Sequence, residues 1–268
     1  LRHEDQTLAI YPAPLAPHPY PYPFPMDREA GIEAYQAMIT AEEYKAKLAR
    51  GDKSALHIYT VKGDSPVIQV IVTKAEATAE GVMKYEFQPA AGGDLPAWHA
   101  GAHLDIVVAP EFLRQYSMSG DPKDRSKYQI AVLREDEGRG GSKLMHRIFT
   151  EGRSIFISKP INHFPLDTSV TRSILMGGGI GITPIIAMAR ELYAAGREFE
   201  VHYSGRSRRK MGLLDDIERS PWADRVHLHI SDENSRADLA EIMGSSQAGT
   251  HVYTCGAERY MTSVVNAA

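Results

Sequence analysis

The sequence predicts an antiparallel β-barrel followed by an α/β domain built on a parallel sheet. Residues 66–168 alternate short apolar strands with glycine- and proline-containing turns, which is typical of a small barrel. Residues 169–268 alternate strands with helices, the pattern of a parallel sheet covered on both faces. The length of 268 residues also suits two compact domains better than one.

Hydrophobic periodicity places the individual elements. In the first region we expect strands at 67–74, 83–89, 103–108 and 128–133. In the second region we expect strands at 172–176, 198–204, 226–230 and 251–255, and helices at 183–195, 213–219, 236–243 and from about 258.

Residues 1–65 exceed what these two domains need, and we interpret them as an N-terminal extension. Seven prolines between residues 12 and 25 predict an extended, polyproline-like arm, either a surface tether or a ligand for a proline-binding domain. A helix is expected over 30–48 and a strand over 56–61. No motif assigns this extension a role.

Composition excludes some classes of function. The formal net charge of −4 gives no overall attraction to nucleic acid or to an anionic membrane. No apolar run approaches the ~18–20 residues that cross a bilayer, and the N-terminus does not resemble a signal peptide. Because the sequence opens on Leu1, we expect a processed or trimmed start. The single cysteine, Cys255, can form no internal disulfide and cannot hold an iron–sulfur cluster. We therefore expect a cytoplasmic protein.

A glycine turn at 177–184, with the sequence GGGIGITP, follows the strand expected at 172–176. Glycines let a backbone turn sharply and approach a ligand closely. Thr183 is expected to cap the following helix and Pro184 to occupy its first position. A helix that begins at such a turn favours a phosphate. The segment lacks the G-x-G-x-x-G fingerprint, so a nucleotide site and a merely tight connection both stay open.

Two further segments carry polar groups that suit a phosphate or a planar ring. In Arg-Gln-Tyr-Ser (114–117) an arginine can pair with phosphate, and the tyrosine can pack on a ring. Gly-Arg-Gly-Gly-Ser (138–142) precedes a helical stretch, where free N–H groups and the serine hydroxyl suit phosphate. Taken singly, each segment is explained better without a ligand, the first as a surface arginine beside a core tyrosine and the second as a simply capped helix.

The order of these motifs resembles the ferredoxin–NADP reductase superfamily, and within it the phthalate dioxygenase reductase group that serves multicomponent oxygenases. The resemblance rests on Arg-x-Tyr-Ser (114–117), Gly-Gly-Ser (140–142), Pro-x-Asn-x-Phe-Pro (160–165), GGGIGITP (177–184) and Cys-Gly (255–256). It covers residues 66–268, about three quarters of the chain. It implies a flavin-binding barrel at 66–168 and a nicotinamide-binding domain at 169–268.

The resemblance also implies the cofactors and their residues. FMN would be held by Arg114, Tyr116, Ser117, Val132, Leu133, Gly140, Gly141 and Ser142. NADH, or alternatively NADPH, would contact Gly178, Gly179, Thr183, Arg206, Cys255 and Gly256. Cys255 and Thr183 would be the catalytic residues, because they border the nicotinamide beside the flavin.

The implied activity is hydride transfer from NAD(P)H to FMN, followed by single-electron transfer to an iron–sulfur centre and a terminal oxygenase. Members of the group carry a [2Fe–2S] domain after the nicotinamide domain, so we expect that cluster on a missing domain or a partner chain. Two alternatives stay open. One is an FAD-dependent reductase of a flavodoxin, haem protein or ferric complex, and the other is a non-enzymatic nucleotide-binding assembly subunit.

Other conspicuous residues have plainer interpretations. His99 and His103, and likewise His227 and His229, are expected to be structural. The basic run at 206–210 forms either a solvated face or a site for an adenosine phosphate.

Overall fold

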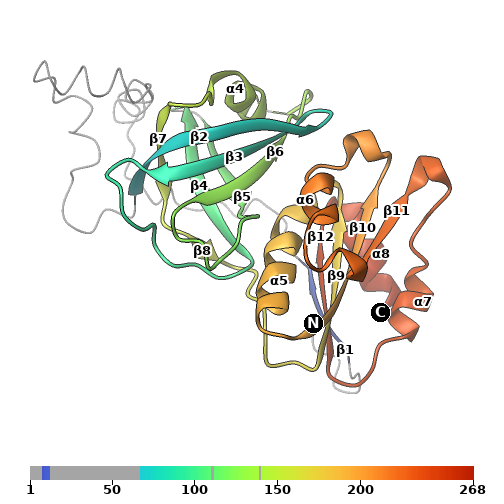
Figure 1. The fold of residues 1–268 in the computed structure, drawn as a ribbon. Coiled ribbons are helices and arrows are strands. Elements are labelled where there is room, and N and C mark those ends of the chain that lie inside the picture. The colour runs from blue at the N-terminus through green and yellow to red at the C-terminus, as the bar shows by residue number, and fades with distance from the viewer. Residues whose placement is uncertain (1–7, 13–66, 110–111, 139) are drawn as a thin grey trace, which may run out of the picture.

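The computed structural model describes residues 8–12, 67–109, 112–138 and 140–268, and it contains one antiparallel and one parallel sheet (Figure 1). The predicted fold class is therefore confirmed. The proline-rich arm at 13–25, the helix at 30–48 and the strand at 56–61 were predicted in a part of the chain that lies outside the described residues.

The antiparallel sheet has the strand order β5-β4-β7-β2-β3-β6, and β8 pairs with β4. A bridge between Met118 and Ile130 joins its two outer strands and closes the barrel. The strands are β2 (Val67–Ala79), β3 (Val82–Pro89), β4 (Ala102–Ala109), β5 (Phe112–Ser117), β6 (Tyr128–Leu133), β7 (Ser154–Ser158) and β8 (Ile161–Asn162), and helix α4 (Gly141–Ile148) lies between β6 and β7.

Side-chain alternation explains the barrel strands. Leu104, Ile106 and Val108 on β4 are fully buried, because every second residue of a strand points to the same face. Tyr85 of β3 fills the interior and stacks edge-on against Phe149, with 5.9 Å between ring centroids. Phe149 directly follows α4, so this contact fixes the helix over one end of the barrel.

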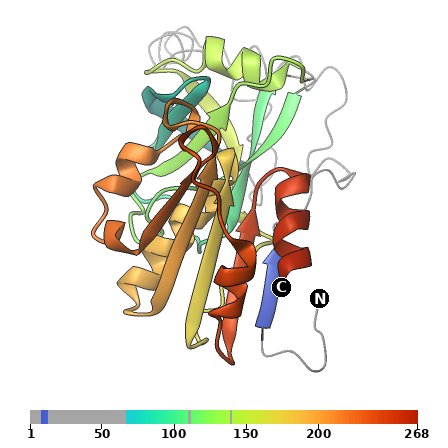
Figure 2. The ribbon, with the colours of Figure 1, turned by 90° about the vertical axis from the view of Figure 1, so that its right-hand side faces the viewer.

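The parallel sheet has the strand order β1-β12-β9-β10-β11. Helices α5 and α6 pack on one face, and α7 and α8 pack on the other, as Figure 2 shows for α8. The elements are β1 (Leu8–Pro12), β9 (Arg172–Gly178), β10 (Glu198–Gly205), β11 (Val226–Ile230), β12 (Thr250–Cys255), α5 (Ile182–Ala194), α6 (Leu214–Glu218), α7 (Leu239–Gly244) and α8 (Glu258–Ala267), with 3-10 turns η1 (Gly179–Gly181), η2 (Arg208–Lys210), η3 (Ala223–Arg225) and η4 (Ser231–Glu233).

The edge of the parallel sheet differs from the expectation. Strand β1, at Leu8–Pro12 within the predicted extension, pairs in parallel with β12, with Leu8 opposite Thr250 and Pro12 opposite Thr254. The first described segment of the chain is thus part of the parallel sheet. Proline is tolerated at the end of an edge strand, because no backbone N–H is needed there to pair with another strand.

Candidate functional site

The two segments predicted to hold a phosphate meet where α4 begins. Arg114 lies within strand β5, and its side chain packs on the backbone of Gly141. A Cβ at residue 141 would lie 2.7 Å from Arg114 Nε, so any larger residue there would displace the Arg114 side chain. Arg114 also donates from Nη1 to the carbonyl of Leu113 at 2.8 Å. Gly140, at the N-terminal cap of α4, has φ 93°, a conformation that favours glycine.

Two positive groups meet at this junction. The guanidinium of Arg114 lies beside the first turn of α4, whose unpaired N–H groups carry a partial positive charge. The hydroxyl of Ser142 accepts a hydrogen bond from the Glu135 amide at 3.0 Å and ties the preceding loop to the helix. The combination suits a dianionic phosphate group.

The other barrel residues in the predicted set lie on neighbouring strands. Burial raises the pKa of Tyr116 to about 12, although the nearby Arg114 opposes the shift. Ser117 ends β5 opposite His103. Val132 and Leu133 end β6, where the carbonyl of Val132 lies 2.8 Å from His146 Nε2 and the Leu133 side chain is exposed. Strand β6 also contacts η1 of the parallel-sheet region.

The glycine turn and the Cys-Gly pair come together at the carboxyl edge of the parallel sheet. Strands β9 and β12 are neighbours, and Cys255 lies opposite Gly177. A Cβ at Gly181 would lie 2.3 Å from the carbonyl oxygen of Cys255, so the turn packs directly on β12. After β9 the chain continues to its neighbour β10 on one side of the sheet, whereas β12 is the neighbour of β9 on the other side. Such a switch point is where open α/β sheets bind ligands.

The start of α5 corrects one expectation. The helix begins at Ile182 with Gly181 as its cap, so Thr183 is not the cap and Pro184 is its third residue. The Thr183 side chain is buried and donates to the carbonyl of Ile180 at 3.1 Å. The reason is η1, which adds a tight turn before the helix and moves its start toward the glycines.

Sequence reasoning missed Tyr260 of α8. Its ring covers Gly178 and Gly256, since a Cβ at either glycine would lie within 3 Å of the ring, at 2.7 Å and 2.9 Å respectively. Tyr260 therefore links the glycine turn to the Cys-Gly pair. The only signal in the sequence was an aromatic residue five positions after Cys255, which is too common to single out.

Cys255 is electrostatically inert at this edge. Burial raises the pKa of its thiol to about 12, against a smaller opposing effect of the Gly256 backbone. The thiol therefore stays protonated and uncharged over the ordinary pH range.

Two of the four basic residues in the run at 206–210 are paired with acidic groups. Arg208 Nε lies 2.9 Å from Glu233 Oε1, and its Nη1 lies 3.6 Å from Glu218 Oε1. Arg209 lies 3.4 Å from Glu80 of the barrel. Arg206 is exposed just after β10.

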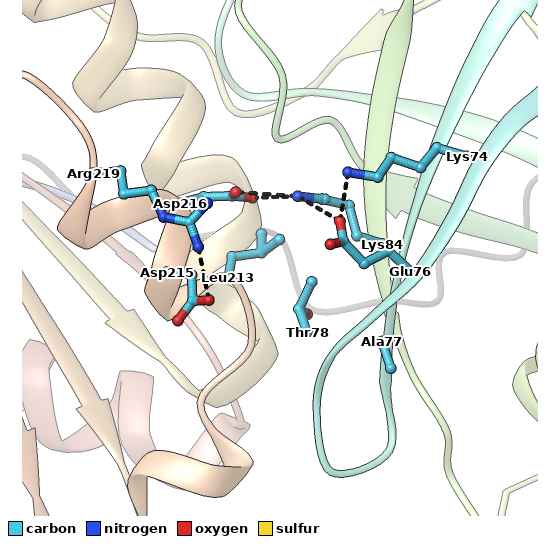
Figure 3. Close-up of a pocket in the computed structure, with 9 residues that line it drawn as sticks. All are labelled: Lys74, Glu76, Ala77, Thr78, Lys84, Leu213, Asp215, Asp216 and Arg219. Atoms are coloured by element: carbon cyan, nitrogen blue, oxygen red, sulfur yellow. Dashed lines mark hydrogen bonds and ion pairs between the residues drawn. The ribbon is translucent and has the colours of Figure 1, made fainter.

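An ion-pair network joins the two sheets (Figure 3). The buried Lys84 of β3 donates to both carboxylate oxygens of Asp216 in α6, at 3.1 Å and 2.9 Å, and lies 3.2 Å from Glu76. Nearby, the Glu80 amide donates to the carbonyl of Arg209 at 2.7 Å. The network borders a cleft of about 150 Å³ whose lining includes none of the predicted cofactor residues. We call this network the domain seam. We interpret it as the contact that fixes the position of β6 relative to η1.

A closed antiparallel barrel, joined to a parallel sheet whose glycine-rich switch point faces it, defines the ferredoxin reductase-like class of proteins. The chain is 38% identical over 204 residues to the vanillate O-demethylase oxidoreductase of Pseudomonas sp. (strain HR199 / DSM 7063). It is 40% identical over 179 residues to the phenoxybenzoate dioxygenase subunit beta of Ectopseudomonas oleovorans. The structure of phthalate dioxygenase reductase matches at 33% identity with a TM-score of 0.72. The chain belongs to the ferredoxin reductase-like family of oxygenase reductases.

The matches extend over 75%, 66% and 75% of this chain and over 64%, 56% and 64% of the respective relatives. The chain thus spans less than two thirds of the length of these relatives. No protein-family model matches it. Across the part of the chain that the structure describes, none of the helices combines the length and apolar character needed to cross a membrane.

Proposed function

We propose that the chain is the flavin- and nicotinamide-binding part of an oxygenase reductase, with FMN and NADH as its cofactors. In this proposal electrons leave the flavin singly for an iron–sulfur centre and then a terminal oxygenase. The names of the relatives support an oxygenase system, and the phthalate dioxygenase reductase structure is described as a module for electron transfer from pyridine nucleotides to [2Fe–2S].

The contact between Arg114 and Gly141 supports FMN. It places the guanidinium beside the first turn of α4, where a phosphate would also meet the unpaired N–H groups of the helix. Tyr116 and Ser117, on the same strand as Arg114, would contact the ring and its ribityl chain, with Val132 and Leu133 on β6 completing the wall. A flavin bound there would accept a hydride and release its electrons one at a time.

The observation that carries the proposal is the contact of Gly181 with Cys255 at the switch point, on an edge whose turn η1 faces β6. Gly178, Gly179 and Thr183 would then border the dinucleotide, with Cys255 and Gly256 beside the nicotinamide. The residues act by setting distance and angle between two bound rings. Because the Cys255 thiol stays protonated, it adds no charge beside the ring.

The ion pairs of the basic run favour NADH. A 2′-phosphate needs a converging cationic group near the end of β10. Arg208 and Arg209 already face Glu233 and Glu80, which leaves Arg206 and Lys210 of the run to contact the adenosine.

The test has two arms on the purified chain. Mass spectrometry of the released cofactor is expected to give FMN, and anaerobic addition of NADH is expected to bleach the flavin absorbance. Arg114→Ala is expected to weaken flavin binding by about 10- to 150-fold, because a charge-assisted contact contributes roughly 1.5–3 kcal/mol. Released FAD would contradict the FMN assignment. A colourless protein that takes up no flavin would contradict the enzymatic proposal.

A further inference from the structure

Four polar side chains gather on one face of β10 and β11, below the carboxyl edge that carries the glycine turn. Glu200 and His202 are two residues apart on β10 and share a face. The parallel register places His227 of β11 opposite His202, and His229 opposite Ser204. The sequence analysis expected the two histidines of β11 to be structural.

Three of these residues have the spacing of metal ligands. His202 Nε2 lies 3.4 Å from Glu200 Oε1, and His227 Nε2 lies 3.9 Å from Glu200 Oε2. One ligand atom from each residue falls within 4.8 Å of the others. Tetrahedral Zn²⁺ with bonds of about 2.0–2.1 Å separates its ligand atoms by about 3.3 Å. The His202–Glu200 distance already matches, and the His227 side chain, 52% exposed, has room to approach.

The burial and orientation of the His202 ring favour a bound ion most strongly. His202 is only 5% exposed, and its Nε2 faces Glu200 Oε1 at 3.4 Å without forming a well-aligned hydrogen bond. Its other nitrogen, Nδ1, lies 3.0 Å from His229 Nε2. When Nδ1 donates to His229, a lone pair on Nε2 points into the cluster, in the arrangement that orients metal-bound histidines in proteins. A buried lone pair beside a carboxylate oxygen is unfavourable unless a proton or a cation lies between them, and when Nδ1 donates to His229 a cation takes that place.

Arg172 sets the limits of the site. Its Nη2 lies 3.1 Å from Glu200 Oε2, so it holds that oxygen and leaves Oε1 to His202. Its positive charge also opposes a second cation nearby, so we expect weaker binding than in a closed structural zinc site.

We propose that Glu200, His202 and His227 bind a divalent metal ion of borderline softness, such as Zn²⁺, which ties the edge strand β11 to β10. Two imidazoles and one carboxylate are a donor set that Zn²⁺ accepts, and the exposed side of His227 leaves the fourth position to water. The site is independent of the proposed flavin chemistry and needs no redox-active ion.

Untagged, chelator-treated protein titrated with ZnCl₂ tests the proposal by calorimetry and by thermal unfolding. We expect one bound equivalent and a rise in Tm of about 5–10 °C at a hundredfold excess over Kd. His227→Ala is expected to weaken binding at least tenfold without unfolding the chain, because its side chain is half exposed. His99→Ala is the matched control, since His99 is an exposed histidine outside the cluster.

The buried His202→Ala is expected to abolish binding at this site, and circular dichroism establishes whether that variant is folded. Binding of less than one equivalent to the wild-type chain would overturn the proposal. Unchanged affinity in the folded His227→Ala variant would also overturn it. A loss of affinity in His99→Ala equal to that in His227→Ala would show adventitious surface binding instead.

Discussion

The Arg114 side chain occupies the space that a side chain at residue 141 would need. A Cβ there would lie 2.7 Å from Arg114 Nε and 3.1 Å from its Cζ. Residues 114 and 141 are 27 positions apart in the sequence, yet they lie against each other in the fold. Because Gly141 has no side chain, the guanidinium can lie along the start of α4.

Gly141→Ala is therefore expected to displace Arg114 and weaken FMN binding by about tenfold or more, because a charge-assisted contact of about 1.5–3 kcal/mol is lost. Fluorescence of released flavin measures the affinity. Gly244→Ala is the control, since no atom lies within 4 Å of the added Cβ. If Gly141→Ala binds FMN with wild-type affinity, the contact between Arg114 and Gly141 does not contribute to the proposed FMN site.

The fold was predictable wherever a short segment determines its own structure. Strands β6 and β11 begin and end where predicted, because each is an apolar run between turn residues. Strand β5 was missed because Arg114 and Gln115 give it a polar centre, and only pairing with β4 makes it a strand. Strand β1 depends on β12, more than 230 positions away, so local sequence carries no signal of it.

Replacing Cys255 tests the nucleotide side. Cys255→Ala is expected to slow flavin reduction by NADH while FMN stays bound, because the residue lies at the switch point and not beside Arg114. Stopped-flow absorbance measures the rate. An unchanged rate of flavin reduction would mean that Cys255 contributes only to packing.

The raised thiol pKa adds a pH dependence with a defined sign. Burial favours the protonated thiol in the folded state, so its contribution to stability is complete below the ordinary pKa of 9.0. That contribution is lost as the pH rises toward about 12. The wild-type reduction rate should therefore show no inflection from Cys255 between about pH 6 and 8. In urea unfolding between pH 9 and 11, the wild type should lose stability relative to Cys255→Ala.

Lys84→Met tests the domain seam. It leaves the carboxylate of Asp216, whose side chain is 23% exposed, without its cation. Breaking a fully buried pair costs about 3–5 kcal/mol, and we expect about 1–2 kcal/mol here because water still reaches Asp216. Urea unfolding measures the loss. The control is Lys74→Met, because Lys74 is 44% exposed and its pair with Glu76 should contribute under about 1 kcal/mol.

If both lysine variants lose the same free energy of unfolding, the pair between Lys84 and Asp216 does not stabilise the domain seam. Reduction by NADH adds a second measurement, because the seam sets how β6 meets η1. We expect Lys84→Met to slow flavin reduction more than Lys74→Met, at a temperature where both are folded.

The candidate site was predictable as motifs but not as a set of contacts. The family resemblance implied that GGGIGITP and Cys-Gly are two segments of one site, whereas the packing of Tyr260 over Gly178 depends on how α8 returns to the sheet. The same limit applies to the basic run at 206–210, where the sequence left two interpretations open. Glu233 and Glu80 come from other elements, and only the fold shows that they pair with Arg208 and Arg209.

These pairs lead to the prediction on nucleotide choice. We expect kcat/KM for NADH to exceed that for NADPH by about tenfold or more, since a preference of that size corresponds to about 1.4 kcal/mol. Glu233→Gln is expected to raise kcat/KM for NADPH and leave that for NADH nearly unchanged, because it releases the Arg208 guanidinium held at 2.9 Å. Glu218→Gln is the graded control, since its oxygen lies farther from Arg208, at 3.6 Å. A wild-type preference for NADPH of about tenfold would reverse the assignment, because it would mean that the basic run binds the 2′-phosphate despite its acidic partners.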